Sequence, residues 1–166
     1  MRVVLRICLI SFMTMMFFSV SSGRVYAEKD EQLDLPKTTI NPGSFYYPLK
    51  RLWEKGRDVL NFTTGSKKSY ALTLLTIRLS ELNYVVDNKL LSEVQTSSER
   101  FSYSAGIVAD LVKKADDDEK KKLIEDFEKY GKFLENLRDK YAANSSFWML
   151  IQHDINTLKI LSEKLK

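Results

Sequence analysis

Few side chains in this chain are equipped for acid–base or metal chemistry, and the sequence has one histidine, His153. Met149 lies four residues earlier, so both side chains can face one soft metal ion such as copper from the same helix. Two ligands on one helix make an incomplete site, and we expect no metal there. Asp154 follows directly, but adjacent helical residues point apart, so no His–Asp pair is expected. His153 falls off the apolar face of its helix, which predicts a solvated side chain.

Three other site patterns fail on their spacing. A di-iron helical bundle needs Glu-x-x-His motifs, and Leu150 stands three residues before the only histidine. Residues 65–68 (Gly-Ser-Lys-Lys) lack the upstream glycine and the strand of a phosphate-binding loop, so they predict a helix start. Residues 116–119 (Asp-Asp-Asp-Glu) lack the alternation of a calcium loop and are typical of a helix N-terminus. We therefore expect no catalytic residue, no cofactor and no metal.

The charge balance argues against nucleic acid as a partner. The sequence has 26 basic and 22 acidic residues, a formal net charge of +4. Three basic residues and no acidic one lie in residues 1–27, so the rest of the chain carries 23 basic residues against 22 acidic ones. A chain this close to neutrality has no electrostatic basis for holding a phosphate backbone.

Residues 1–27 have the pattern of a secretory signal peptide. Two arginines precede an uncharged, largely apolar run over 7–20, and Val25 and Ala27 occupy the two positions that a signal peptidase reads. The run of 14 residues is shorter than the ~20 that a spanning helix needs. We predict cleavage after Ala27 and export to the periplasm, cell envelope or medium, with retention as an anchor as the alternative. Cleavage also removes Cys8, the only cysteine, so burial alone must stabilise the fold.

Residues 28–41 are polar and interrupted by Pro36, which predicts a leader or linker before a helical domain over 42–166. Its three large apolar residues can lie along that domain: Leu33, Leu35 and Ile40. Pro42 and Gly43 predict a turn, and Pro48 suits the first turn of a short helix. The face of this helix that we expect to be buried consists of Leu49, Leu52, Trp53, Val59 and Leu60.

Four longer segments carry apolar residues spaced three and four apart, which predicts helices over about 66–86, 90–114, 118–142 and 147–165. Their expected seams are Leu72, Leu75, Leu79, Leu82 and Val86; Leu91, Val94, Ser98, Phe101, Ala105, Val108 and Val112; Leu123, Phe127, Tyr130, Leu134, Leu137 and Tyr141; and Trp148, Ile151, Ile155, Leu158 and Leu165. Short turns make neighbouring helices antiparallel. The sequence therefore predicts an all-α fold, an antiparallel four-helix bundle with an additional short N-terminal helix packed on it.

One block of the sequence resembles a known family. The matching residues are Pro42, Ser44, Tyr47, Pro48, Leu49, Lys50, Arg51 and Glu54, with Trp53 inside the block, and Arg78, Leu79 and Glu81 on the next helix. These positions resemble the domain of unknown function five-six-six-seven, a family of exported or membrane-associated prokaryotic proteins. The resemblance covers about residues 41–111. It implies a helical fold and an extracytoplasmic location, and it carries over no catalytic residue.

The same block raises the question of architecture or docking. Tyr46, Tyr47 and Trp53 are expected in the core rather than on a binding surface. Two pairs have surface spacing, Lys50 with Glu54 and Arg78 with Glu81. A sharper hypothesis is that Glu54 or Glu81 meets Arg51 or Arg78 between helices and fixes the short helix on the bundle.

The function expected from these observations is that of an exported, non-catalytic helical-bundle protein. Its partner would be an unknown protein of the envelope or the extracellular space, with the chain serving as an interaction, scaffold or envelope-stress component. The alternative is a peripheral membrane-surface module with weak contact through lysines at 113–114 and 120–122, although acidic residues are interleaved with them. An enzyme ranks third, because the sequence offers no nucleophile with a matching base.

Overall fold

The structure, a computed structural model, describes residues 33–61 and 63–166. This part of the chain contains five helices and no strand, which confirms the all-α prediction for the described residues. The helices are α2 (Tyr47–Leu60), α3 (Thr64–Asp87), α4 (Leu91–Val112), α5 (Asp117–Arg138) and α6 (Ser146–Leu165). The predicted signal peptide, with Val25 and Ala27 at its cleavage site, lies outside the described residues and stays a prediction.

Side-chain caps fix where three of the long helices begin. Thr63 accepts a hydrogen bond from the backbone N–H of Ser66 and starts α3, so residues 65–68 form the helix start that the sequence predicts. Asp116 accepts from the backbone N–H of Glu119 at 2.8 Å and starts α5, with three more acidic residues in its first turn. Negative side chains there complement the helix dipole, which confirms the capping interpretation of the acidic run. Ser145 caps α6 in the same way.

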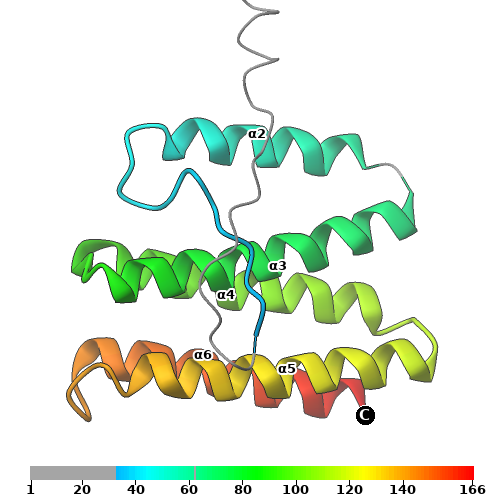
Figure 1. Cartoon of the computed structure of the whole chain (residues 1–166). Helices are drawn as coiled ribbons and strands as arrows, with labels where there is room; N and C mark the ends of the chain where they lie inside the picture. Colours follow the sequence, from blue (N-terminus) through cyan, green and yellow to red (C-terminus); the bar gives the residue numbers. More distant parts are fainter. Residues whose placement is uncertain (1–32, 62) are drawn as a thin grey trace, which may run out of the picture.

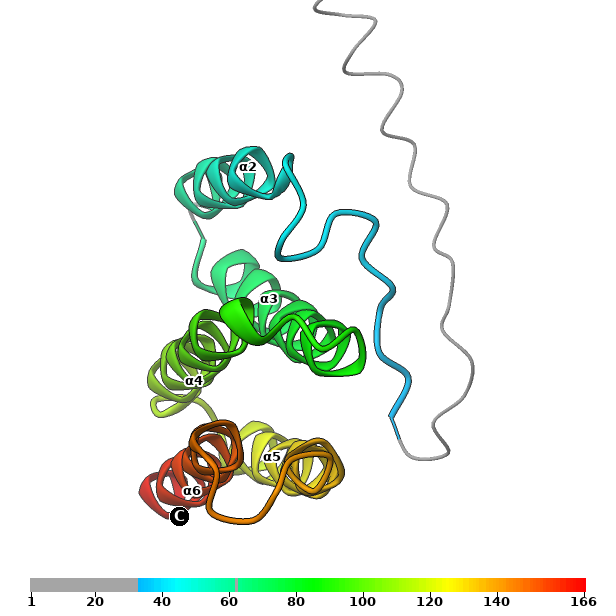
Figure 2. The same cartoon turned by 90° about the vertical axis from the view of Figure 1, so that its left-hand side faces the viewer.

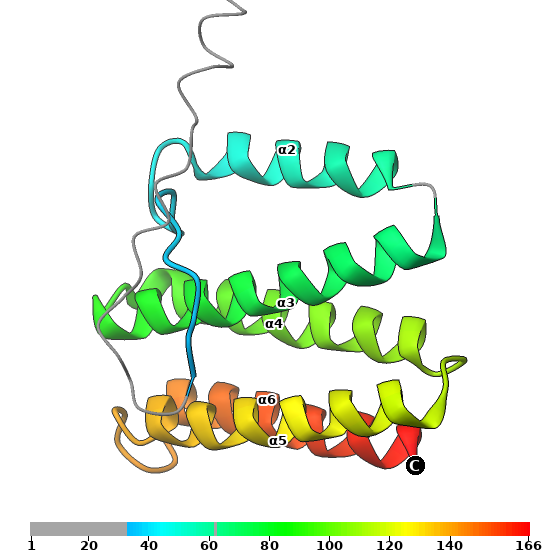
Figure 3. The same ribbon diagram turned by 45° about the vertical axis from the view of Figure 1, so that its right-hand side comes forward.

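The four long helices form the predicted antiparallel bundle. Helix α3 packs mainly on α4, α4 on α6, and α6 on α5, while α3 and α5 contact each other less. Successive helices run in opposite directions, and α2 forms an outermost layer beyond α3 (Figures 1 and 2). Residues 33–41 run along the side of the bundle where α3 and α5 lie, and α2 then runs lengthwise along the outer side of α3 (Figures 2 and 3).

The predicted seams of α3–α6 build the core. Leu75, Leu79, Phe101, Leu134 and Ile151 are fully enclosed, and most other predicted seam residues are buried with them. The clear exception is the first seam residue of α4, Leu91, which is 48% exposed because it begins the helix beside a tight turn. A chain with a single cysteine has no internal disulfide, so the buried apolar surface of this core must stabilise the fold.

The segment 33–41 is attached to the bundle rather than detached from it. Leu33 and Leu35 pack against the core, as their apolar character suggests. The Ser80 hydroxyl on α3 donates a hydrogen bond to the carbonyl of Pro36 at 2.6 Å. These contacts place the N-terminal end of α2 relative to α3.

Within the described residues, no helix is both long and apolar enough to span a bilayer.

Candidate docking site on helix α2

Helix α2 faces the bundle with polar side chains. Tyr47 and Glu54 are buried, and Lys50 and Arg51 are half-buried. Positions 47, 50, 51 and 54 recur three and four residues apart, so they share one face of the helix. The backbones of α2 and α3 do not pack closely, and long side chains from this face bridge them.

The inner face ends in an ionic cluster. Arg78 of α3 donates hydrogen bonds to Glu54 of α2 and, at 2.5 Å, to Glu81 one turn further along α3. Lys50 of α2 pairs with Glu81 at 2.5 Å. Lys50 also lies 3.9 Å from Glu54, and Arg51 lies 3.2 Å from it. The predicted pairing of Glu54 with Arg78 between helices is therefore confirmed.

Two of the predicted pairs lie elsewhere than expected. Arg78 and Glu81 are 1% exposed each, so they form a buried pair and the surface assignment was wrong. The Lys50–Glu54 pair also lies at the interface with α3, since Glu54 is 8% exposed. Both corrections have one cause: the bundle meets this face of α2, so groups with helical-surface spacing lie between two helices.

Tyrosine hydroxyls extend the cluster at both ends. The Tyr47 hydroxyl donates to Glu81 at 2.8 Å, and Arg100 of α4 donates to the Tyr47 oxygen at 3.2 Å. The Arg100 guanidinium also lies 5.2 Å from the centre of the Tyr47 ring, within cation–π range. The Tyr70 hydroxyl of α3 donates to the backbone carbonyl of Glu54 at 2.8 Å. Lys50 donates to the carbonyl of Ile40, which joins residues 33–41 to the same cluster.

The electrostatics of the cluster favour the charged forms. Burial alone would lower the pKa of Arg78, but Glu81 and Glu54 together raise it above its ordinary value. Burial alone would raise the pKa of Glu81, but Arg78 and Lys50 more than reverse that and lower it. The pKa of the Tyr47 hydroxyl is raised by burial and by the Glu81 charge, so it stays a hydrogen-bond donor. Every ionised group in the cluster is thus committed to a partner within the chain.

The opposite face of α2 is apolar and turned to solvent. We define the outer ridge as its exposed apolar residues with the two aromatic residues just before them: Phe45, Tyr46, Leu49, Leu52, Trp53 and Leu60. Their exposed fractions run from 57% to 90%. The prediction that this face is buried was wrong, as was the placement of Tyr46 and Trp53 in the core; Tyr47 alone is buried. The side chain of Val59 lies outside the described residues.

The remaining residues of the resembling block shape the entry to α2. Pro42 is buried, and Gly43 adopts φ +85°, a left-handed conformation that favours glycine. The Ser44 carbonyl accepts from the backbone N–H of Tyr47, and Pro48 stands in the first turn. Leu79 of α3 is fully buried in the core beneath. The structure therefore brings together Tyr47, Lys50, Arg51, Glu54, Arg78 and Glu81, and leaves Leu49 and Trp53 on the other side.

Two polar features escaped the sequence analysis. Arg100 joins the cluster from α4, a helix outside the matched block, and no spacing pointed to it. Asp154 of α6 is fully buried, with one carboxylate oxygen accepting from the Ser102 hydroxyl at 2.5 Å. Burial raises the pKa of Asp154 to about 7, and the hydroxyls of Ser102 and Ser98 oppose that rise. A signal existed, because residues 151, 154, 155 and 158 share one helical face.

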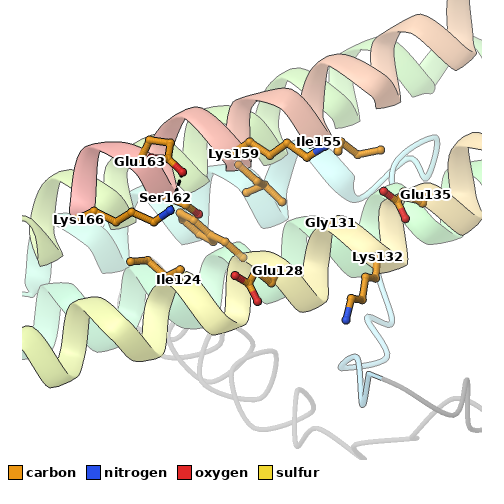
Figure 4. Close-up of a pocket in the computed structure, with 12 residues that line it drawn as sticks. Ile124, Glu128, Gly131, Lys132, Glu135, Ile155, Lys159, Ser162, Glu163 and Lys166 are labelled. Atoms are coloured by element: carbon orange, nitrogen blue, oxygen red, sulfur yellow. Dashed lines mark hydrogen bonds and ion pairs between the residues drawn. The ribbon is translucent and has the colours of Figure 1, made fainter.

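Other parts of the described chain give weaker evidence of a functional site. His153 is exposed, as predicted, and Met149 is 59% exposed. Within residues 33–61 and 63–166, no three His, Cys, Asp or Glu side chains gather as metal ligands. A shallow groove of about 260 Å³ lies between α5 and α6 (Figure 4). Its rim carries three glutamates and three lysines: Glu128, Glu135, Glu163, Lys132, Lys159 and Lys166.

The outer ridge and the ionic cluster beneath it are therefore the most distinctive arrangement in the described chain. This arrangement is suited to non-covalent binding, because apolar side chains face outward and the charges are paired on the inner face. The resemblance to the domain of unknown function five-six-six-seven stays a prediction. No family model, no curated protein and no solved structure matches this chain.

Proposed function

We propose that the protein is an exported, non-catalytic docking domain that acts through the outer ridge of α2. Its role is that of an interaction, scaffold or envelope-stress component outside the cytoplasm. The observation that carries this proposal is the orientation of α2: its polar face is fixed to the bundle and its apolar face is presented to solvent.

The orientation of α2 is costly unless a second surface covers the ridge. Burying an exposed leucine or aromatic side chain stabilises by about 1.5–3 kcal/mol, and α2 forgoes that gain within its own chain. A contiguous exposed apolar patch is typical of an interaction site. The ionic cluster supports the same role, because it holds the inner face against α3 and keeps the ridge outward.

Cysteine protection in envelope fractions tests the proposal. The chain beginning at Glu28 has no cysteine, so Leu52→Cys creates one reporter on the ridge and Met149→Cys creates a matched control on α6. Leu52 is 67% and Met149 59% exposed, so a membrane-impermeant maleimide should label both equally in purified protein. In envelope fractions of the source cells we expect slower labelling at position 52 only. Equal labelling at both positions would contradict docking through the ridge.

A further inference from the structure

The outer ridge of α2 concentrates apolar surface in a short stretch of chain. Among the described residues, twelve large hydrophobic side chains are exposed, and six of them fall within residues 45–60. The other six are spread over α3, α4 and α6: Tyr84, Leu91, Tyr103, Ile107, Met149 and Ile160. A partner that covers exposed apolar surface is therefore expected to bind at the ridge.

The shape of the ridge argues against a second copy of this chain. Helix α2 has 14 residues, so it is ~21 Å long and ~10 Å across with its side chains. A stable dimer buries about 800 Å² on each partner, which exceeds what one face of so short a helix provides. Because α2 is the outermost layer (Figure 2), two ridges in contact would hold the larger helices apart and gain little additional area.

The charges beside the ridge favour an anionic partner. Of the six charged side chains of α2, Lys50, Arg51 and Glu54 lie on the inner face in the ionic cluster. Lys55 and Arg57 are exposed on either side of the ridge, with Asp58 the only exposed acid of the helix. Lys67, in the first turn of α3, adds another exposed cation near the C-terminal end of α2.

These features together match a helix that lies in a membrane interface. Such helices bury leucine and aromatic side chains at the boundary of headgroups and acyl chains, and they carry lysine and arginine alongside. Tyrosine and tryptophan place a polar edge at the headgroups and an apolar ring below them. The inner face of α2 stays with the protein, because turning the ridge inward would separate Glu54 from Arg78.

We propose that the outer ridge binds the surface of an anionic lipid bilayer, with α2 parallel to the membrane plane and Lys55 and Arg57 against the headgroups. This inference rests on the proposed docking role of α2 and specifies the surface that it docks to. It does not involve the lysines at 113–114 and 120–122.

Vesicle co-sedimentation tests the inference. The chain beginning at Glu28 includes every described residue, and circular dichroism verifies that each variant is helical. We expect binding to phosphatidylcholine vesicles that contain phosphatidylglycerol, weaker binding to pure phosphatidylcholine, and loss of the difference at high salt. Leu52→Glu should weaken binding at least about tenfold, whereas Met149→Glu should leave it unchanged.

Fluorescence locates the contact on the ridge. The chain has two tryptophans, so Trp148→Phe leaves Trp53 as the only source of tryptophan emission. We expect a blue shift of the Trp53 emission on mixing with anionic vesicles and none with Leu52→Glu. Replacing Lys55 and Arg57 by glutamine should remove the preference for phosphatidylglycerol.

The outcomes separate this inference from the proposed function. No binding of the wild-type chain to protein-free anionic vesicles would overturn the lipid inference. If position 52 is still protected in envelope fractions, docking through the ridge stands and a protein is the partner. If neither protection nor vesicle binding is seen, both proposals fail. Equal weakening by Leu52→Glu and Met149→Glu would also overturn the inference, because the contact would then not be confined to the ridge.

Discussion

The junction between α2 and α3 and the junction between α4 and α6 both bury carboxyl groups, but with different surroundings. At the first, Glu54 and Glu81 lie against Arg78, with Lys50 beside them. At the second, Asp154 contacts serine hydroxyls and one of its oxygens has no hydrogen-bond partner among the described residues. The pKa of Glu81 is lowered and that of Asp154 is raised, although both are buried.

The comparison shows that burial does not by itself fix the charge of a carboxyl group. Desolvation opposes ionisation in both places, and a nearby guanidinium reverses it in only one. The α2–α3 junction is thereby an ionic attachment for a helix that has little apolar contact with the bundle. The α4–α6 junction is an apolar interface that tolerates one poorly compensated acid.

Removing the cation is the strongest way to break this contrast. Arg78→Met leaves two buried carboxylates without their central partner, so we expect a loss of about 3–5 kcal/mol in the free energy of unfolding. Urea denaturation followed by circular dichroism measures it. The control variant also replaces Glu54 and Glu81 by methionine and should recover most of the loss, because it removes the stranded charges. An unchanged denaturation midpoint for Arg78→Met would show that the cluster is not an attachment.

Asp154, the buried acid without a neighbouring cation, should destabilise the fold when it loses its proton. The pKa of Asp154 is raised from 3.8 to about 7, so the folded state binds the proton more tightly than the unfolded state does. Stability should therefore fall as the pH rises from about 4 to about 7, by at most about 4 kcal/mol. Asp154→Asn should be more stable than the wild type at pH 8 and close to it at pH 4, as measured by urea denaturation at each pH.

Glu81 sharpens the same experiment at its acidic end. Its pKa is lowered on folding, so its stabilising contribution is complete above its ordinary value and is lost as the pH falls through the folded one. Wild-type stability should consequently pass through a maximum near pH 4–5. Asp154→Asn should retain the acidic limb and lose the slope above it. Parallel curves for the two proteins would contradict the assignment of that slope to Asp154.

A smaller change probes the edge of the cluster. Tyr47→Phe removes the hydroxyl that donates to Glu81 and accepts from Arg100, while the ring stays in place. We expect a loss of about 1–2 kcal/mol, typical of a buried hydrogen bond to a charged group. Tyr103→Phe, on an exposed ring of α4, is the matched control and should change little. Equal effects from the two variants would remove Tyr47 from the cluster.

The smallest effect is expected where an ion pair reaches solvent. Lys68 of α3 pairs with Glu119 of α5 at 2.5 Å, but the glutamate side chain is 42% exposed. Lys68→Gln should therefore cost no more than about 1 kcal/mol, and added salt should reduce that cost further. A loss as large as that of Arg78→Met would mean that the distance of a pair, and not its burial, decides its contribution.

The long helices could be predicted because burial on one side leaves a regular apolar seam in the sequence. Leu75, Leu79 and Leu82 are spaced as a helix requires and are fully enclosed. The same rule gave the correct face composition for α2 but the wrong direction for it. Periodicity identifies which residues share a face, and it does not say whether that face meets the bundle or solvent.

The signal for the true direction was on the other face of α2. Glu54 and Arg78 were matched as a possible pair, and a buried pair between helices requires that the polar side of α2 point inward. Asp154 was considered only as a partner for His153, so its place on the buried seam was missed, although it lies three residues from Ile151 and four from Leu158. The contact of Arg100 with Tyr47 could not be predicted from the spacing of residues, because only the tertiary fold brings α4 beside Tyr47.

The contacts of Lys50 bear on the order in which parts of the chain fold. Its ammonium group joins three parts of the chain, the Ile40 carbonyl, Glu54 of α2 and Glu81 of α3. We expect contacts of this kind to form after the seams of α3–α6 have assembled, so α2 should attach late and outside the folding nucleus. Substitution of Lys50 would then accelerate unfolding and leave the refolding rate nearly unchanged.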